Sequence, residues 1–154
     1  MIKVMFVCHG NICRSPMAEF VFKDIVAKNN LSDKFIIDSS ATSREEIGNG
    51  IHYGTRAKLI EENIPFDNHR AVQFTPKDYN DYDYILLMDR NNLRNINRII
   101  GEDTENKIHL LLDFAHGGDI ADPWYTGNFD DTYRDITVGA NAFLEYLRNN
   151  KCIR

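Results

Sequence analysis

A cysteine and an arginine stand six residues apart near the start of the chain, and the residues between them suit a tight loop. Cys8 follows an apolar run that predicts a buried strand, and Arg14 precedes a predicted helix. Gly10 and Asn11 tolerate positive φ angles, so the loop can curl until its backbone N–H groups converge. Converging N–H groups at the start of a helix bind a dianionic oxyanion such as phosphate.

The same loop is suited to the chemistry of a phosphate ester. The planar guanidinium of Arg14 can hold two phosphate oxygens at once. Ser15 is a good N-cap and Pro16 suits the first helical position, so the helix would direct its positive dipole end into the loop. This field stabilises a thiolate, and Cys8 is therefore expected to be a nucleophile at neutral pH. The alternative is a small core cysteine beside an ordinary turn.

The composition is that of one globular domain and of a cytoplasmic enzyme. The chain has 154 residues, of which 43% are hydrophobic and 27% charged. Its net charge of −5 argues against general binding to nucleic acid or to a membrane surface. Met1 leads directly into strand-like sequence, and no apolar stretch is long enough to span a bilayer. An odd number of cysteines, three, suggests no disulfide framework. The histidines do not have the spacing of metal ligands. We also expect a monomer.

Apolar strands alternate with helices along the chain. The sequence predicts strands at residues 2–7, 35–39, 84–88 and 108–112, and helices at residues 16–28, 53–62, 90–100 and 131–151. A short capped helix is expected from Thr75, and Asp89 is expected to cap the helix at residues 90–100. Continuous apolar strands joined by helices favour a parallel sheet covered on both faces. Right-handed crossovers then allow few topologies. We expect an α/β, flavodoxin-like (Rossmann-like) fold with strand order 2-1-3-4, in a single domain over residues 1–154.

This fold predicts that a ligand binds at the carboxyl edge of the sheet. The loop after the fourth strand begins at the same edge and carries a second group of candidate residues. Ligands of such sheets bind at the carboxyl ends of the strands, where the chain reverses direction, and Cys8 ends the first strand. A long loop follows the fourth strand and contains Asp122, Trp124 and Tyr125. A carboxyl group beside two aromatic residues can keep a proton for a leaving oxygen. Asp119 is a rival acid in this loop, and a solvated aspartate before a turn proline is the alternative.

The chain resembles the low-molecular-weight protein tyrosine phosphatases over nearly its whole length. Three stretches carry the resemblance in the order and spacing of the family: residues 7–15 resemble its phosphate loop, residues 38–43 followed by 47–49 its second loop, and residues 122–125 its general-acid loop. Residues 82–89 and 92–93 also fit. The resemblance implies hydrolysis of phosphotyrosine in proteins, and of small aryl phosphates, without metal or organic cofactor. Inorganic phosphate and other oxyanions would inhibit such an enzyme.

The resemblance also implies a role for each site residue. Cys8 would form a cysteinyl-phosphate intermediate, Arg14 would hold the phosphoryl oxygens, and Asp122 would protonate the leaving phenol and then activate water. Ser15 would hydrogen-bond the thiolate, and Cys13 would capture oxidised Cys8 as a reversible disulfide, which implies redox regulation. Substrate binding would fall to the rest of the loop and two aromatic residues: His9, Gly10, Asn11, Ile12, Cys13, Trp124 and Tyr125. Two polar residues would support the loop: Ser39 and His69.

Two departures from the family pattern concern substrate preference. Glu45, beside Glu46, stands near a position that is often aromatic in the family, and His9 stands where the family often has an apolar residue. A protein-arginine phosphatase is the nearest alternative, but such enzymes tend to carry threonine at the position of Ile12. An arsenate reductase of the same fold needs further cysteines, of which only Cys152 remains. A phosphoprotein-binding module would lack either the nucleophile or the acid.

Overall fold

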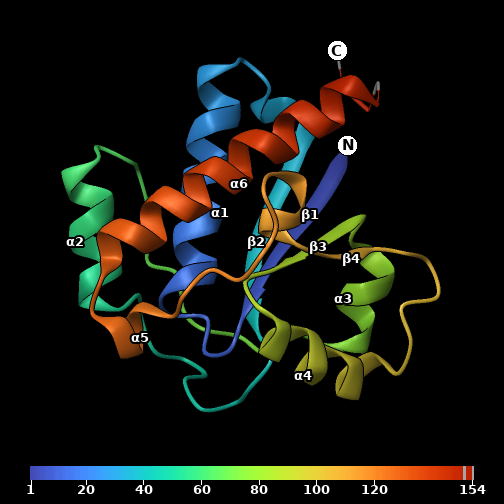
Figure 1. The fold of residues 1–154 in the computed structure, drawn as a ribbon, viewed down its shortest axis with the longest axis horizontal. Coiled ribbons are helices and arrows are strands. Elements are labelled where there is room, and N and C mark those ends of the chain that lie inside the picture. Colours follow the sequence, from blue (N-terminus) through green and yellow to red (C-terminus); the bar gives the residue numbers. More distant parts are fainter. Residues whose placement is uncertain (151, 154) are drawn as a thin grey trace.

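The computed structural model describes residues 1–150, 152 and 153, and its centre is a sheet of four parallel strands in the order β2-β1-β3-β4 (Figure 1). The strands are β1 (Ile2–Cys8), β2 (Phe35–Ala41), β3 (Tyr84–Leu87) and β4 (Ile108–Leu110). Val4 of β1 is in register with Ile37 on one side and Tyr84 on the other. The predicted strand order is therefore confirmed, and Cys8 lies at the carboxyl edge of the sheet.

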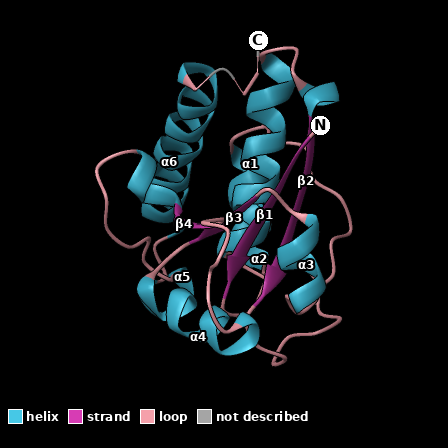
Figure 2. Ribbon diagram, turned by 90° about the vertical axis from the view of Figure 1, so that its right-hand side faces the viewer, coloured by secondary structure: helices cyan, strands magenta, loops and turns pink. Residues whose placement is uncertain are grey.

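Helices cover both faces of this sheet (Figures 1 and 2). One face carries α1 (Arg14–Lys28), α2 (Tyr53–Glu61) and α6 (Phe129–Asn149), and the other carries α3 (Pro76–Asp81) and α4 (Arg90–Ile100). Successive side chains of β1 alternate between these two cores, Val4 and Phe6 in the first, Met5 and Val7 in the second. Burial on both faces explains why the strands are continuously apolar. No helix in the described part of the chain is long and apolar enough to cross a membrane.

The fourth strand is shorter than the sequence predicts. It ends at Leu110, and the expected residues 111–112 belong instead to a 3-10 helix, η2 (Leu111–Phe114). Leu111 is buried against α6, where Gly139 allows a close approach: a Cβ atom on Gly139 would lie 2.6 Å from Leu111 Cγ. Because the chain leaves the sheet after Leu110, Leu111 and Leu112 are buried under α6. The apolar sequence pattern that predicted the strand does not reveal this tertiary packing.

The start of α6 and two short helices also differ from the prediction, and two caps agree with it. Helix α6 starts at Phe129 because the Asn128 side chain caps it, and it ends at Asn149; the expected end at Lys151 lies outside the described residues. An unexpected short helix, α5 (Pro123–Thr126), follows Asp122, and a 3-10 helix, η1 (Ser32–Lys34), precedes β2. The predicted caps form full capping boxes at the starts of α3 and α4: Thr75 and Asp89.

Candidate active site

The loop between β1 and α1 wraps around the sulfur of Cys8. The backbone N–H groups of Asn11 and Ser15 point at Cys8 Sγ, with N–S distances of 3.3 and 3.4 Å. Asn11 makes this turn possible with a φ of 59°, a left-handed conformation that asparagine adopts more readily than most residues. Gly10, contrary to expectation, needs no positive φ. A Cβ atom at Gly10 would lie 3.4 Å from Glu46 Cγ, which is an ordinary van der Waals contact.

Ser15 is not the N-cap that the sequence predicts. Helix α1 starts at Arg14, and its N-cap residue Cys13 makes no side-chain capping bond. Ser15 therefore lies in the first helical turn, and its hydroxyl oxygen is 3.0 Å from Cys8 Sγ. Pro16 is tolerated there because N–H groups of the first turn have no partner within the helix. The loop is shorter than predicted, and its serine faces the thiol instead of the helix end.

Asn11 is fully buried and joins the loop to the structure behind it. Its side-chain N–H groups donate to Ser15 Oγ (2.8 Å) and Ser39 Oγ (3.0 Å). Its carbonyl Oδ1 lies 2.8 Å from His69 Nε2. Ser39 in turn donates to Glu19 Oε1 at 2.6 Å, and Glu19 is buried in α1. The structure thus brings Ser39 and His69 against the loop, and these bonds hold its left-handed residue in place.

The guanidinium of Arg14 is buried and anchored from behind. Its Nη1 donates to Asp89 Oδ2 (2.6 Å) and to the carbonyl of Ile120 (2.9 Å), and its Nη2 lies 3.4 Å from Asp122 Oδ2. Burial acts to lower the pKa of Arg14, but the negative charges of Cys8, Asp89 and Asp122 outweigh it and raise the pKa above its ordinary value. Arg14 is therefore a permanent positive charge of fixed orientation at the edge of the pocket.

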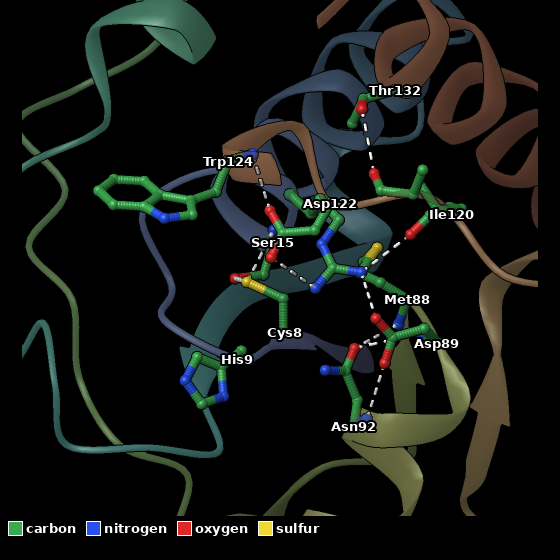
Figure 3. Close-up of polar contacts among 12 residues, drawn as sticks. Cys8, His9, Ser15, Met88, Asp89, Asn92, Ile120, Asp122, Trp124 and Thr132 are labelled. Carbon is green, nitrogen blue, oxygen red and sulfur yellow. Dashed lines mark hydrogen bonds and ion pairs between the residues drawn. The ribbon is translucent and has the colours of Figure 1, made fainter. Parts of the chain in front are cut away.

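Asp122 is positioned by the short helix that follows it. Its Oδ1 accepts the backbone N–H of Trp124 at 3.0 Å, so the carboxyl group caps α5. Figure 3 shows Asp122 close to Cys8, with Trp124 above Cys8 and His9 below it at the left of the view. The rival Asp119 instead accepts the backbone N–H of Arg90, and it does not line the pocket around Cys8. Of the two acids, the structure places Asp122 beside the thiol.

Cys8 lies in an open pocket of about 140 Å³. A cavity of about 150 Å³ holds one benzene molecule, so a single aromatic ring fits this volume. The pocket walls come from the loop, from the segment after β2 and from α5: Cys8, His9, Gly10, Ile12, Cys13, Arg14, Glu45, Glu46, Asp122, Trp124 and Tyr125. All the predicted catalytic and substrate-binding residues except the buried Asn11 and Ser15 line it.

Cys13 is buried beside the nucleophile candidate but differs from it chemically. Burial, with smaller contributions from the negative charges of Cys8 and Asp122, raises the pKa of the Cys13 thiol to about 12. Cys13 is therefore protonated across the physiological range. Within the described residues, no group of three or more His, Cys, Asp and Glu side chains is placed to hold a metal ion.

Sequence reasoning assigned no role in the site to two carboxylates that the structure places there. Asp89 binds Arg14, and Glu19 binds Ser39. A signal existed for Asp89, because it follows the third strand and therefore lies at the same carboxyl edge of the sheet as Cys8. Glu19 gives a weaker signal, because an acid in a helix with Lys23 four residues later suggests an ordinary ion pair, which does form. Its other partners are Ser39 of β2 and His69, and only the folded chain identifies these.

Comparison with known proteins agrees with this geometry. The family model described as low molecular weight phosphotyrosine protein phosphatase matches residues 3–152. The low molecular weight protein-tyrosine-phosphatase YfkJ of Bacillus subtilis is 41% identical over 98% of this chain and 99% of its own. Its crystal structure superposes with a TM-score of 0.94, covering 98% of this chain and 97% of that one. The human low molecular weight phosphotyrosine protein phosphatase is 40% identical, over 92% and 93% of the two chains.

The chain belongs to the low molecular weight phosphotyrosine protein phosphatase family. The resemblance found in the sequence is thereby confirmed, as is the fold that it implies. The arginine phosphatase alternative has a structural neighbour of its own. The Drosophila arginine phosphatase DARP is 30% identical with a TM-score of 0.86, covering 94% of this chain and 97% of that one. The tyrosine phosphatases named above are the more similar group.

Proposed function

We propose that this phosphatase hydrolyses phosphotyrosine in proteins, with Cys8 as nucleophile, Arg14 as phosphate-binding group and Asp122 as general acid and base. One observation carries the proposal: these three side chains line one pocket of about 140 Å³ beneath an aromatic wall. Trp124 and Tyr125, which are 58% and 84% exposed, form that wall. The pocket can hold the ring while the phosphate reaches the sulfur.

The first chemical step transfers the phosphoryl group to sulfur. The Cys8 thiolate attacks phosphorus, the bond from phosphorus to the phenolic oxygen breaks, and Asp122 gives its proton to that oxygen. N–H groups of the loop and Arg14 bind the phosphoryl oxygens, where negative charge is concentrated in the transition state. Ser15, 3.0 Å from the sulfur, stabilises the thiolate that later departs.

The second step returns the free enzyme. Asp122, now ionised, takes a proton from water, and the water oxygen attacks phosphorus as the bond from sulfur to phosphorus breaks. Inorganic phosphate leaves, and it competes with substrate because it fits the same nest of donors. Arg14 stays in place through both steps because Asp89 and the carbonyl of Ile120 hold it. No step draws on a metal or an organic cofactor.

The test is a metal-free assay with a matched set of substrates. Hydrolysis of p-nitrophenyl phosphate in the presence of a chelator, with competitive inhibition by inorganic phosphate, separates the enzyme from a phosphoprotein-binding module. Competition by phosphotyrosine, phosphoserine and phosphoarginine peptides of one sequence then ranks the substrate class. Ile12 and Trp124 favour an aromatic ester, so the phosphotyrosine peptide is expected to compete best. A stronger effect of the phosphoarginine peptide would support an arginine phosphatase.

We further propose a cytoplasmic monomer. The mechanism requires Cys8 as a free thiol, and reducing compartments such as the cytoplasm keep thiols free. The proposed nucleophile, arginine and acid line the same pocket of a single chain, so one copy carries the groups that the proposed reaction uses. Sedimentation at micromolar concentration tests the monomer, and fractionation of cells that express the chain tests the location.

A further inference from the structure

The mouth of the catalytic pocket has two unlike walls. Trp124 and Tyr125 of α5 form an aromatic wall. A second part of the lining comes from the segment after β2 and carries two adjacent carboxylates, Glu45 and Glu46. An aromatic ring held on the first wall leaves the neighbouring residues of a peptide substrate close to the second. The charge of that second wall can therefore act on the sequence around the phosphotyrosine.

Both carboxylates are held at the rim by contacts within the protein. Glu45 Oε2 lies 2.9 Å from His9 Nε2, so this pair joins the segment after β2 to the catalytic loop. Glu46 Oε2 accepts a hydrogen bond from Asn49 Nδ2 at 2.6 Å, and its Cγ packs over Gly10. The Glu45 side chain remains 70% exposed, so its charge faces the solution from which a substrate arrives.

Carboxylates outnumber fixed positive charges among the residues that line the pocket. Arg14 is the one fixed cation among the described residues that line it, and the proposed mechanism reserves Arg14 for the phosphate. Three carboxylates line the same pocket, those of Glu45, Glu46 and Asp122. His9 is the remaining titratable group with basic character, and it is paired with Glu45. Arg44 is exposed and does not line the pocket. A dianionic phosphate must therefore pass an acidic rim.

We propose that Glu45 and Glu46 are specificity-determining residues, which select phosphotyrosine segments with arginine or lysine next to the phosphotyrosine and disfavour segments with aspartate or glutamate there. The inference rests on the proposed function. A basic side chain of the substrate pairs with the rim while the phosphate enters, and an acidic one adds repulsion. Each exposed ion pair changes an equilibrium by roughly 1.4- to 5-fold. Attraction in one peptide and repulsion in the other thus give a difference on the order of tenfold.

The test compares three phosphotyrosine peptides that differ only in the residues on either side of the phosphotyrosine: arginine, alanine or glutamate. We expect kcat/KM, measured by phosphate release at low salt, to fall in that order, by on the order of tenfold from arginine to glutamate. The difference is expected to shrink at about 1 M salt, where the screening length is about 3 Å.

Variants test whether Glu45 and Glu46 cause the preference for the arginine peptide. In Glu45→Gln/Glu46→Gln the ratio between the arginine and glutamate peptides is expected to approach one, and in Glu45→Lys it should shift toward the glutamate peptide. Glu102→Gln is the matched control, because it removes the same charge from the exposed loop after α4, on the edge of the sheet where β4 begins. It should keep the parent's ratio.

Three results would overturn the inference. The first is equal kcat/KM for all three peptides while p-nitrophenyl phosphate is hydrolysed, which leaves the proposed function intact. The second is an unchanged preference in the double variant. The third is the same loss of preference in Glu102→Gln, which would assign the effect to net charge. If neither p-nitrophenyl phosphate nor any peptide is hydrolysed, the proposed function itself fails, and the inference fails with it.

Discussion

The sulfur of Cys8 and the hydroxyl oxygen of Ser15 lie 3.0 Å apart at the base of the pocket. The backbone N–H groups of Asn11 and Ser15 also point at this sulfur. Three hydrogen-bond donors can therefore meet on one atom, and donors of this kind stabilise negative charge. The first prediction concerns the reactivity of that atom.

Cys8→Ser is expected to lower kcat by on the order of 10³-fold or more, because a serine hydroxyl is not ionised at neutral pH. Phosphate binding should remain, since the loop N–H groups and Arg14 are still present. Turnover of p-nitrophenyl phosphate and calorimetric titration with inorganic phosphate measure the two effects. Appreciable metal-free turnover by the variant would remove Cys8 from the mechanism.

Asp122→Asn is expected to lower kcat by about 10²- to 10⁴-fold for aryl phosphates with poor leaving groups, and by less for good ones. The reason is that a poor leaving group needs a proton in the transition state. A series of substituted phenyl phosphates measures the dependence. Asp119→Asn is the matched control in the same loop, and it should leave the dependence unchanged. Equal losses for all leaving groups would indicate that Asp122 has a structural role alone.

Cys13 is expected to resist alkylation in the folded protein. Burial, aided by the charges of Cys8 and Asp122, raises its pKa to about 12. Because the pKa of a thiol is raised, the unreactive protonated form persists at every pH well below that value. Iodoacetamide at pH 7.5, and again at pH 9, should modify Cys8 but not Cys13, as read by peptide mapping. Urea should expose Cys13 to the reagent. Modification of Cys13 in the folded protein at pH 7.5 would contradict the argument.

Peroxide is expected to inactivate the enzyme reversibly. Peroxide oxidises the Cys8 thiolate to a sulfenic acid, and the Cys13 thiol then displaces water to form a disulfide. Oxidation removes the negative charge of Cys8, one of the causes of the raised pKa of Cys13, and so eases this capture. Recovery with a thiol reductant, relative to each protein's own starting activity, should be lost in Cys13→Ser. A mapped Cys8–Cys152 disulfide, or full recovery of the variant, would reject the pairing.

Gly139→Ala is expected to destabilise the fold although it favours the helix. Alanine gains about 1 kcal/mol over glycine in a helix interior. The new methyl group would meet Leu111 Cγ at 2.6 Å, and overpacking a core costs about 1–3 kcal/mol. We therefore expect a net loss of up to about 2 kcal/mol in the free energy of unfolding, measured by urea denaturation. Asn141→Ala, at an exposed position of the same helix, should not destabilise the protein.

The sequence by itself determined the sheet and its strand order, and it singled out the three residues that we propose as chemically active. Apolar strands that alternate with helices leave few topologies, and a parallel sheet brings the ends of its strands to one edge. Local patterns of this kind indicate Cys8 and Arg14, which stand at the end of the first strand and at the start of the helix after it. The choice of Asp122 over Asp119 came from the family resemblance. The helix caps at Thr75 and Asp89 were predictable for the same reason, because a capping box joins residues only three positions apart, and the structure contains both.

Contacts between distant segments were decided by the tertiary structure alone. Ser15 was expected to cap the helix and, by resemblance, to hydrogen-bond the thiolate. The helix starts earlier, at Arg14, so Ser15 contacts the thiol but caps nothing. Asp89 anchors Arg14 across 75 positions of sequence, and His9 meets Glu45 across 36. A hydrogen bond or ion pair depends on a separation of a few ångströms. The sequence states the order of residues along the chain, and only the packing of helices on the sheet sets such separations.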